Sequence, residues 1–173
     1  EDHVGRAHES GQPLGAGDMP AAETLGQVLR SRHPDFAEGE YVRHFGGWQE
    51  YGLSTGERTE RVDPALAPLS AWLGVLGMPG LTAWASVIEL AGVHADQTVL
   101  VSAALGPVGS MVGQLAMLRG AQAVGIAGSD EKCGIVTREF GFRACVNYRQ
   151  DGFLEALRAA LPDGADIYHD NVG

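Results

Sequence analysis

The chain has 173 residues, of which 45% are hydrophobic and 20% charged, and it carries a formal net charge of −10 at pH 7. This length can bury a sizeable core, while an acidic chain without a basic tract argues against nucleic acid or an anionic membrane as the main partner. Because no apolar run reaches about 18 residues and no charged segment followed by an apolar one opens the chain, we expect neither a membrane-spanning helix nor a secretory signal.

The first 65 residues predict a loop followed by a small β-rich unit. Residues 1–20 are rich in Gly, Pro, His and charge and show neither strand nor helix periodicity, so we expect a loop or disorder there. In residues 21–65, short β-type runs alternate with Gly and Pro turns, which predicts part of a β domain. We expect a strand over 24–29, a turn and strand over 38–42, and a third strand over 48–53.

Beyond residue 65 the signals become helical and then alternate. Residues 64–77 and 81–91 are each predicted to be helical, with Met78-Pro79-Gly80 as a breaker between them. After Asp96, apolar β-branched runs alternate with amphipathic segments. We expect strands at 98–102, 123–127, 144–147 and 165–168, and helices at 107–119, 131–140 and 153–161.

This alternation predicts an α/β fold with a parallel sheet and right-handed crossovers. Residues 66–173 would form part of a doubly wound, or Rossmann, domain, which usually needs about six strands. A sheet that ends after its fourth strand leaves an unpaired edge. We therefore expect the sequence to be a fragment, with the domain truncated after that strand.

A small-residue turn joins the strand at 98–102 to the helix that starts at Pro107. Gly106 and Gly109 supply the G-x-x-G core of the dinucleotide-binding pattern, while Ala104 stands where the first glycine is usual. A helix N-terminus after such a turn offers free N–H groups and a partial positive charge to an anion. Because glycine turns also join strands to helices where no ligand binds, the turn alone leaves a purely structural role open.

Several short runs, taken together, resemble one known family. They are GMPGLTAW at 77–84, VSAALGPVGSMVGQLA at 101–116, AGSDEKC at 127–133, FGFRACVNY at 140–148 and DNVG at 170–173. In order and spacing they resemble the zinc-free branch of the medium-chain dehydrogenase/reductase superfamily, and within it the NADP-dependent prostaglandin reductases and alkenal/enone double-bond reductases. The runs RHPDFAEGEYV and GGWQEYGLS are similar to that branch's N-terminal GroES-like domain, which implies that residues 21–65 are part of one.

The resemblance implies a phosphate-binding turn made by Gly106, Pro107, Val108 and Gly109. Gly106 would allow close approach of the backbone, and Gly109 would let the helix lie near the sheet. Pro107 stands where these reductases usually have Ala. Proline is sterically acceptable at the first helical position, but it removes one N–H that could donate to phosphate.

The resemblance also implies NADPH rather than NADH as the cofactor. Lys132, the only lysine among 12 basic residues, matches the position that meets the 2′-phosphate, although Asp130 or Glu131 could instead bind a ribose 2′-OH. Tyr148 matches a contact at the adenine–ribose end, and Asn171 matches one on the nicotinamide side. A solvated lysine and an ordinary strand-end tyrosine are the alternative interpretations.

No metal site is predicted. Cys133 and Cys145 supply neither a zinc quartet nor a disulfide framework, which also favours a reduced, cytoplasmic setting. Zinc-dependent relatives carry Gly-His-Glu where this chain has Ala21-Ala22-Glu23. Four scattered histidines are expected to be surface or hydrogen-bonded residues: His33, His44, His94 and His169.

Without a metal, the expected chemistry is conjugate reduction, in which NADPH transfers hydride to the double bond of an α,β-unsaturated ketone or aldehyde. Tyr51 and Thr82 are candidates for lining the substrate cleft, with a core tyrosine and a helix N-cap threonine as the alternatives. The catalytic residue stays unassigned. Two other functions stay open: a quinone reductase of the same superfamily, and a non-catalytic nucleotide-binding module. A homodimer is common among similar proteins.

Overall fold

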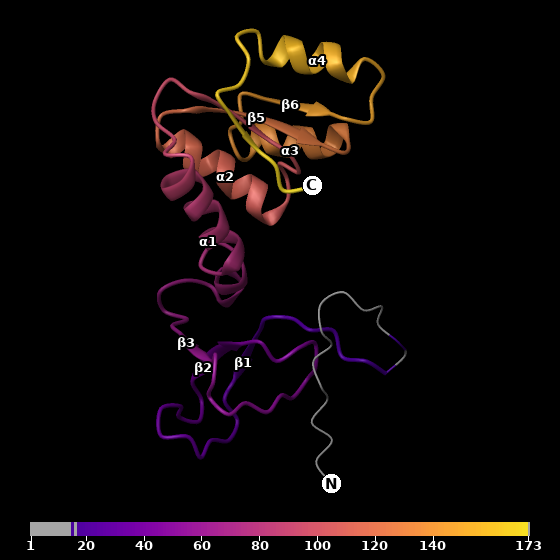
Figure 1. The fold of residues 1–173 in the computed structure, drawn as a ribbon. Helices are drawn as coiled ribbons and strands as arrows, with labels where there is room; N and C mark the ends of the chain where they lie inside the picture. Colours follow the sequence, from indigo (N-terminus) through magenta and orange to yellow (C-terminus); the bar gives the residue numbers. More distant parts are fainter. Residues whose placement is uncertain (1–14, 16, 173) are drawn as a thin grey trace. The chain divides into compact units, whose positions relative to one another are not determined.

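The computed structural model describes residue 15 and residues 17–172. Most of the loop expected over 1–20 therefore lies outside the described residues. The chain forms two compact units, Glu1–Leu73 and Gly74–Gly173 (Figure 1). The domain boundary after residue 65 stays a prediction.

The first unit contains a three-stranded antiparallel sheet in the order β1-β2-β3. Its strands are β1 (Thr24–Gln27), β2 (Tyr41–His44) and β3 (Glu60–Val62). Arg43 on the central strand holds the sheet together, because its guanidinium forms ion pairs with Glu23 at 3.3 Å and with Glu60. The first two expected strands are thus confirmed as β1 and β2.

The strand expected over 48–53 is wrong. That stretch forms bends, and Trp48 and Tyr51 leave 72% and 75% of their surface exposed. Both edges of β2 are already occupied by β1 and β3, so the aromatic run has no edge of the central strand with which to pair. Gly47, with a φ of 75°, also turns the backbone away from an extended path just before this run.

The helix expected over 64–77 is also wrong. Only the five-residue 3-10 helix η1 (Leu69–Leu73) forms there, after a series of turns. Pro64 and Pro68 lack the N–H that an α-helix interior needs, and Gly74 and Gly77 lower helix propensity further. These four residues outweigh the Ala/Leu-rich composition between them.

Met78-Pro79-Gly80, expected to break the helices, instead opens α1 (Met78–Trp84). Pro79 lies in the first turn, where an N–H would have no intrahelical partner. Gly80 allows a close approach, because a Cβ there would collide with the backbone of Val75. The π-helix η2 (Ala85–Leu90) continues the chain, so the expected helical stretch over 81–91 is confirmed.

The second unit contains a four-stranded parallel sheet in the order β6-β5-β4-β7, which confirms the predicted partial Rossmann fold. Its strands are β4 (Thr98–Val101), β5 (Gln122–Ala127), β6 (Ala144–Asn147) and β7 (Ile167–His169). The crossover helices are α2 (Pro107–Leu118), α3 (Asp130–Arg138) and α4 (Phe153–Ala160). All seven elements lie within two residues of their expected bounds.

Helix α2 is buried against the sheet through valines and small residues. Val101 of β4 and Ala116 of α2 are fully buried, and Val112 is 1% exposed. The ring of Phe142, which is 3% exposed, lies so close to Gly113 of α2 that a Cβ at Gly113 would collide with it. Burying one valine side chain stabilises the fold by about 1.5–3 kcal/mol, so this layer is the main core of the unit.

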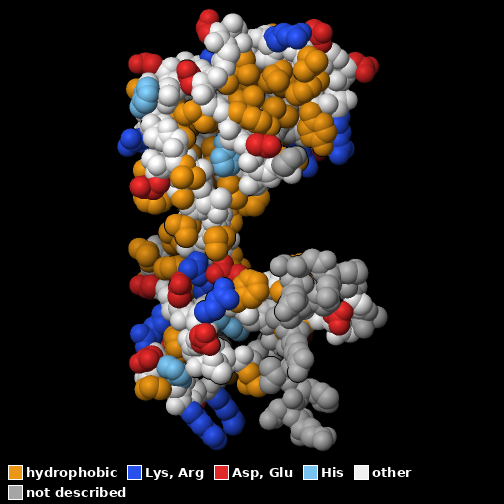
Figure 2. All heavy atoms as spheres, in the orientation of Figure 1, with side chains coloured by type: hydrophobic (Ala, Val, Ile, Leu, Met, Phe, Trp, Pro, Cys, Tyr) orange, Lys and Arg blue, Asp and Glu red, His pale blue; other side chains and the backbone are white. Residues whose placement is uncertain are grey.

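Hydrophobic side chains also gather on the visible surface of the second unit (Figure 2). The exposed large hydrophobic residues of this unit include Tyr148, Leu154, Tyr168 and Val172. Within residues 15 and 17–172, no helix has the length and apolar character needed to cross a membrane.

We predict that Gly113→Ala destabilises the second unit by about 1–3 kcal/mol, because the added methyl group overlaps the buried ring of Phe142. Gly134→Ala in α3 is the matched control: its Cβ would meet only the movable guanidinium end of Arg138. There we expect a gain of up to about 1 kcal/mol from helix propensity. Urea unfolding followed by far-UV circular dichroism measures both, and an unchanged free energy of unfolding for Gly113→Ala would contradict this packing.

Candidate functional site

A cavity of about 830 Å³ opens at the carboxyl ends of the parallel strands in the second unit. The strand order reverses here, since β4 lies between β5 and β7, and ligands of α/β sheets bind at such a reversal. The lining residues are Ser102, Ala103, Leu105, Gly106, Ile126, Ala127, Gly128, Ser129, Lys132, Tyr148, Arg149, Tyr168, Asp170 and Val172.

The turn between β4 and α2 is held by close backbone contacts. Ala103 has a φ of 46°, a left-handed conformation that costs a residue with a side chain about 1–2 kcal/mol. Its carbonyl accepts a hydrogen bond from the Gly106 N–H at 2.7 Å. A Cβ at Gly109 would lie 2.5 Å from the same carbonyl oxygen and 3.0 Å from that of Ser102. Only glycine at position 109 therefore lets α2 begin this close to the strand end.

The N-terminus of α2 keeps two free donors. Gly106 is the N-cap residue and lines the cavity, and Pro107 at the helix start has no N–H. Ser110 is the first residue of α2 whose N–H makes a helical hydrogen bond, which it donates to the Gly106 carbonyl at 3.0 Å. Within the described part of the chain, the Val108 and Gly109 N–H groups have no acceptor. Together with the helix dipole, these two donors favour an anion at this end.

Two cations, Lys132 and Arg149, line the same cavity. Neither has an ion-pair partner among the residues that the structure describes. The Arg149 guanidinium lies over the ring of Tyr148, with its central carbon 5.5 Å from the ring centroid. Asp170 is the only carboxylate among the described lining residues, so the cationic side of the cavity is suited to a negatively charged group.

The start of α3 shows how Lys132 is positioned. Ser129 caps the helix, and its Oγ accepts the Lys132 N–H at 3.2 Å. The Asp130 carboxylate is occupied by the side-chain amide of Asn147, which donates to its Oδ1 at 2.9 Å. Neither Asp130 nor Glu131 lines the cavity, whereas Lys132 does. The charge that the start of α3 presents to the cavity is therefore positive.

A serine connects the ends of β4 and β7. The Ser102 hydroxyl donates to Asp170 Oδ1 at 2.7 Å and accepts the Asn171 N–H at 3.0 Å. Asn171 is thereby fixed through its backbone beside the cavity, although it does not line it. The neighbouring His169 has an Nε2 that is buried without a hydrogen-bond partner among the described residues, and burial lowers the pKa of this imidazole.

Three of the seven cofactor-binding residues expected from the sequence line the cavity: Gly106, Lys132 and Tyr148. The other four, Pro107, Val108, Gly109 and Asn171, lie at its border and do not line it. Four polar residues that line the cavity were not predicted from the sequence: Ser102, Arg149, Tyr168 and Asp170. A usable signal existed for them, because each lies at or just after the carboxyl end of a parallel strand, the edge that holds ligands.

The two candidates for the substrate cleft are not brought to this cavity. Tyr51 lines a separate cavity of about 480 Å³ in the first unit and is too exposed for a core tyrosine. Thr82 lies inside α1, whose N-cap is Gly77, and its hydroxyl donates to the Met78 carbonyl at 2.8 Å. Thr82 is therefore not the N-cap that the alternative interpretation expected.

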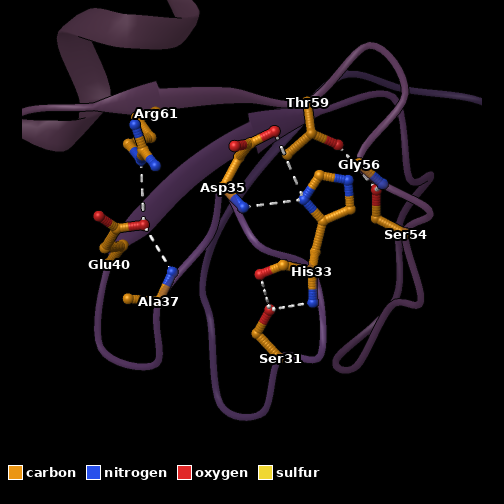
Figure 3. Close-up of polar contacts among 9 residues, drawn as sticks. All are labelled: Ser31, His33, Asp35, Ala37, Glu40, Ser54, Gly56, Thr59 and Arg61. Atoms are coloured by element: carbon orange, nitrogen blue, oxygen red, sulfur yellow. Dashed lines mark hydrogen bonds and ion pairs between the residues drawn. The ribbon is translucent and has the colours of Figure 1, made fainter.

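The cavity in the first unit is bordered by a turn built around His33 (Figure 3). The Asp35 N–H donates to His33 Nδ1 at 3.2 Å, and the Ser31 hydroxyl accepts the His33 N–H at 3.0 Å. Nearby, the Glu40 carboxylate accepts the Ala37 N–H, which holds the pKa of Glu40 below its usual value. Within the described part of the chain, no group of three or more His, Cys, Asp or Glu residues could hold a metal ion.

Comparison with known proteins agrees with this arrangement. Residues 3–62 match a family described as the N-terminal domain of oxidoreductase, and residues 107–173 match one described as zinc-binding dehydrogenase. The chain is 40% identical over 161 residues to NADPH-dependent curcumin reductase of Escherichia coli (strain K12), covering 93% of the chain and 47% of that protein. It is 45% identical over 164 residues to prostaglandin reductase 1 of Bos taurus, covering 92% of the chain and 50% of that protein.

A solved structure is also similar. CurA of Vibrio vulnificus in complex with NADPH superposes with a TM-score of 0.86 at 38% identity, over 96% of this chain and 50% of that one. The fold and the site define an oxidoreductase-type protein of the medium-chain dehydrogenase/reductase superfamily. Within that superfamily, the chain is similar to the alkenal/enone reductase branch. It spans about half the length of the curated relatives it matches.

We predict that Gly109→Ala weakens the binding of ADP, a probe for the pyrophosphate, by at least about tenfold. The added Cβ would press on the Ala103 carbonyl and displace the donors at the start of α2, and a lost charge-assisted hydrogen bond costs about 1.5–3 kcal/mol. Gln114→Ala, an exposed substitution on the same helix, should leave ADP affinity unchanged. Calorimetric titration measures both variants, and equal affinity of Gly109→Ala and the unmodified chain would refute the role of this turn.

Proposed function

We propose that this chain is the nucleotide-binding part of an NADPH-dependent oxidoreductase that reduces the carbon–carbon double bond of α,β-unsaturated ketones or aldehydes. The observation that carries the proposal is the cavity at the strand ends, lined by the N-cap residue of α2 and by two cations without carboxylate partners in the described chain. The relatives named curcumin reductase, prostaglandin reductase 1 and 2-alkenal reductase (NADP(+)-dependent) support the same activity.

The residues present fit such a cofactor. The free N–H groups of Val108 and Gly109 would donate to the pyrophosphate, and Pro107 would contribute none. Lys132 and Arg149 would hold the 2′-phosphate, which carries up to two negative charges. The Ser129 hydroxyl already accepts the Lys132 N–H, which leaves its own proton free to donate to the same phosphate. Two cations and one hydroxyl therefore select for the phosphorylated ribose.

The remaining assignments follow the branch that the chain resembles. Tyr148 would contact the adenine–ribose end, where its ring lies beside the backbone of Gly128. Asn171, fixed by the Ser102 hydroxyl, would lie on the nicotinamide side. NADPH, when bound, supplies the hydride. The protein would hold the reactants in the geometry for hydride transfer and would exclude water. Both effects lower the activation barrier, because less motion is lost and less solvent is rearranged during the reaction.

We also propose that no metal takes part. The lining of the cavity offers one carboxylate and no His or Cys among the described residues, whereas a catalytic zinc usually takes three protein ligands. The substrate would be a small enone or enal, with Tyr51 and Thr82 kept as candidates for its cleft. We propose a cytoplasmic homodimer without a nucleic-acid or membrane partner. The net charge of −10 supports the absence of those two kinds of partner.

Two substitutions test the cationic side of the cavity. Lys132→Ala and Arg149→Ala should each weaken NADPH binding by about 10- to 100-fold, since each removes one charge-assisted contact. Binding of NADH, which lacks the 2′-phosphate, should change by less than about threefold. Fluorescence titration with both cofactors measures the ratio.

Arg138→Ala is the matched control for this pair, because Arg138 is a cation on the last turn of α3 that does not line the cavity. It should leave the NADPH-to-NADH preference unchanged. Equal losses of NADPH and NADH affinity in Lys132→Ala and Arg149→Ala would refute the 2′-phosphate role and would leave only a structural role for these two cations.

The activity itself is tested with the full chain, by NADPH titration followed by oxidation of NADPH in the presence of an enone or a quinone. We expect binding and faster turnover of the enone. Faster turnover of the quinone would support a quinone reductase of the same superfamily, and binding without turnover would support a non-catalytic nucleotide-binding module. Absence of binding would refute all three.

A further inference from the structure

The two cysteines of the chain lie next to each other in the second unit. Cys133 is on α3 and Cys145 is on β6, and their sulfur atoms are 3.0 Å apart. Both are free thiols, and the sequence contains no other cysteine. The two thiols therefore face each other between a helix and the strand that follows it, 12 positions apart in the chain.

Their surroundings hold the two sulfur atoms close together. Cys133 is 8% exposed and Cys145 is half-buried. On the neighbouring strand β5, Gly125 pairs with Cys145, and a Cβ at that glycine would lie 3.1 Å from the Cys145 sulfur. Because Gly125 has no side chain, there is space for the Cys145 sulfur above β5. The Cys133 sulfur lies next to it, on helix α3.

We propose that Cys133 and Cys145 are a redox modification site, at which a reversible intramolecular disulfide fastens α3 to β6. A disulfide bond is about 2.05 Å long, so the two sulfur atoms need to approach by about 1 Å. Rotation about the side-chain bonds of Cys133 and Cys145 can supply such a movement without separating the helix from the strand.

The reaction balances with a small-molecule disulfide, such as oxidised glutathione, as the oxidant. The thiolate of one cysteine attacks a sulfur of the oxidant, forms a mixed disulfide and releases one thiolate. The second cysteine then attacks the protein sulfur of that mixed disulfide and displaces the other half of the oxidant. The protein loses two hydrogen atoms, and the oxidant is reduced to two thiols.

Burial controls the rate of this reaction rather than its end point. Burial, with the neighbouring Cys133 thiol as a further cause, raises the pKa of the Cys145 thiol. Because the thiolate is the attacking species, disulfide formation at neutral pH should be slow. The position of equilibrium depends instead on how well the fold holds the two sulfur atoms together, and the test is therefore an equilibrium measurement.

The disulfide would restrict the helix that carries the cation proposed to bind phosphate. Lys132 directly precedes Cys133, and the Cys133 N–H donates to the Ser129 carbonyl at 3.0 Å in the first turn of α3. A crosslink from Cys133 to β6 therefore anchors that first turn. The redox site itself does not depend on the proposed function, since it is defined by the two thiols alone.

The full chain is equilibrated with mixtures of reduced and oxidised glutathione, starting from the reduced and from the oxidised protein, and the products are identified by mass spectrometry. We expect an internal disulfide between Cys133 and Cys145. Its equilibrium constant against glutathione should be at least tenfold more favourable in the folded chain than in the same chain in urea, because the fold holds the sulfur atoms together. Hydrogen exchange of the α3 amides should slow severalfold in the oxidised form.

Cys133→Ala and Cys145→Val, each chosen to suit its helix or strand, should form only the mixed disulfide with glutathione at the remaining cysteine. The proposal is overturned if the folded chain forms no internal disulfide at equilibrium from either direction. It is equally overturned if the equilibrium constant is no more favourable in the folded chain than in urea. Both readouts are independent of cofactor binding, so failure of the proposed function would not affect them.

Discussion

The candidate site depends on one close backbone contact, between the first turn of α2 and the end of β4. Gly109 lies so near the carbonyl oxygens of Ala103 and Ser102 that no side chain fits at this position. The left-handed conformation of Ala103 reverses the chain there, and the cost of that conformation is offset by the buried layer of α2 against the sheet. Because the helix starts beside the strand end, its two free N–H groups lie at the border of the cavity.

Charge distribution distinguishes this cavity from the rest of an acidic chain. In the first unit, two arginines form ion pairs with carboxylates: Arg43 with Glu23 and Glu60, and Arg61 with Glu40. At the cavity of the second unit, two cations, Lys132 and Arg149, outnumber the single carboxylate, Asp170, among the described lining residues. In a chain with a net charge of −10, an unmatched pair of cations around one cavity concentrates the available positive potential where a phosphate would need it.

The sequence was most informative where local pattern and tertiary packing coincide. From Thr98 onward, the strands of a parallel sheet alternate with helices, and every element was predicted. The two failures have different causes, tertiary pairing in the first case and local helix breakers in the second. The aromatic run at 48–53 has strand propensity but no free edge of β2, and Pro64 and Pro68 exclude a helix from an Ala/Leu-rich segment. Arg149 follows the carboxyl end of β6, a strand that was predicted, so its place at the ligand-binding edge of the sheet could have been predicted as well.

Two further glycines have a role that only the structure reveals. The phosphate pattern points to Gly106 and Gly109 but says nothing of Gly113 and Gly125. The ring of Phe142 fills the space that a side chain at Gly113 would take, and a Cβ at Gly125 would lie 3.3 Å from the same ring. One buried aromatic side chain thus contacts α2 and β5 together. It fixes the helix that would offer donors to a pyrophosphate relative to the strand leading to Ser129 and Lys132. The distance between the two ends of the cavity that are proposed to bind anions is therefore set by the core rather than by the residues that would contact the ligand.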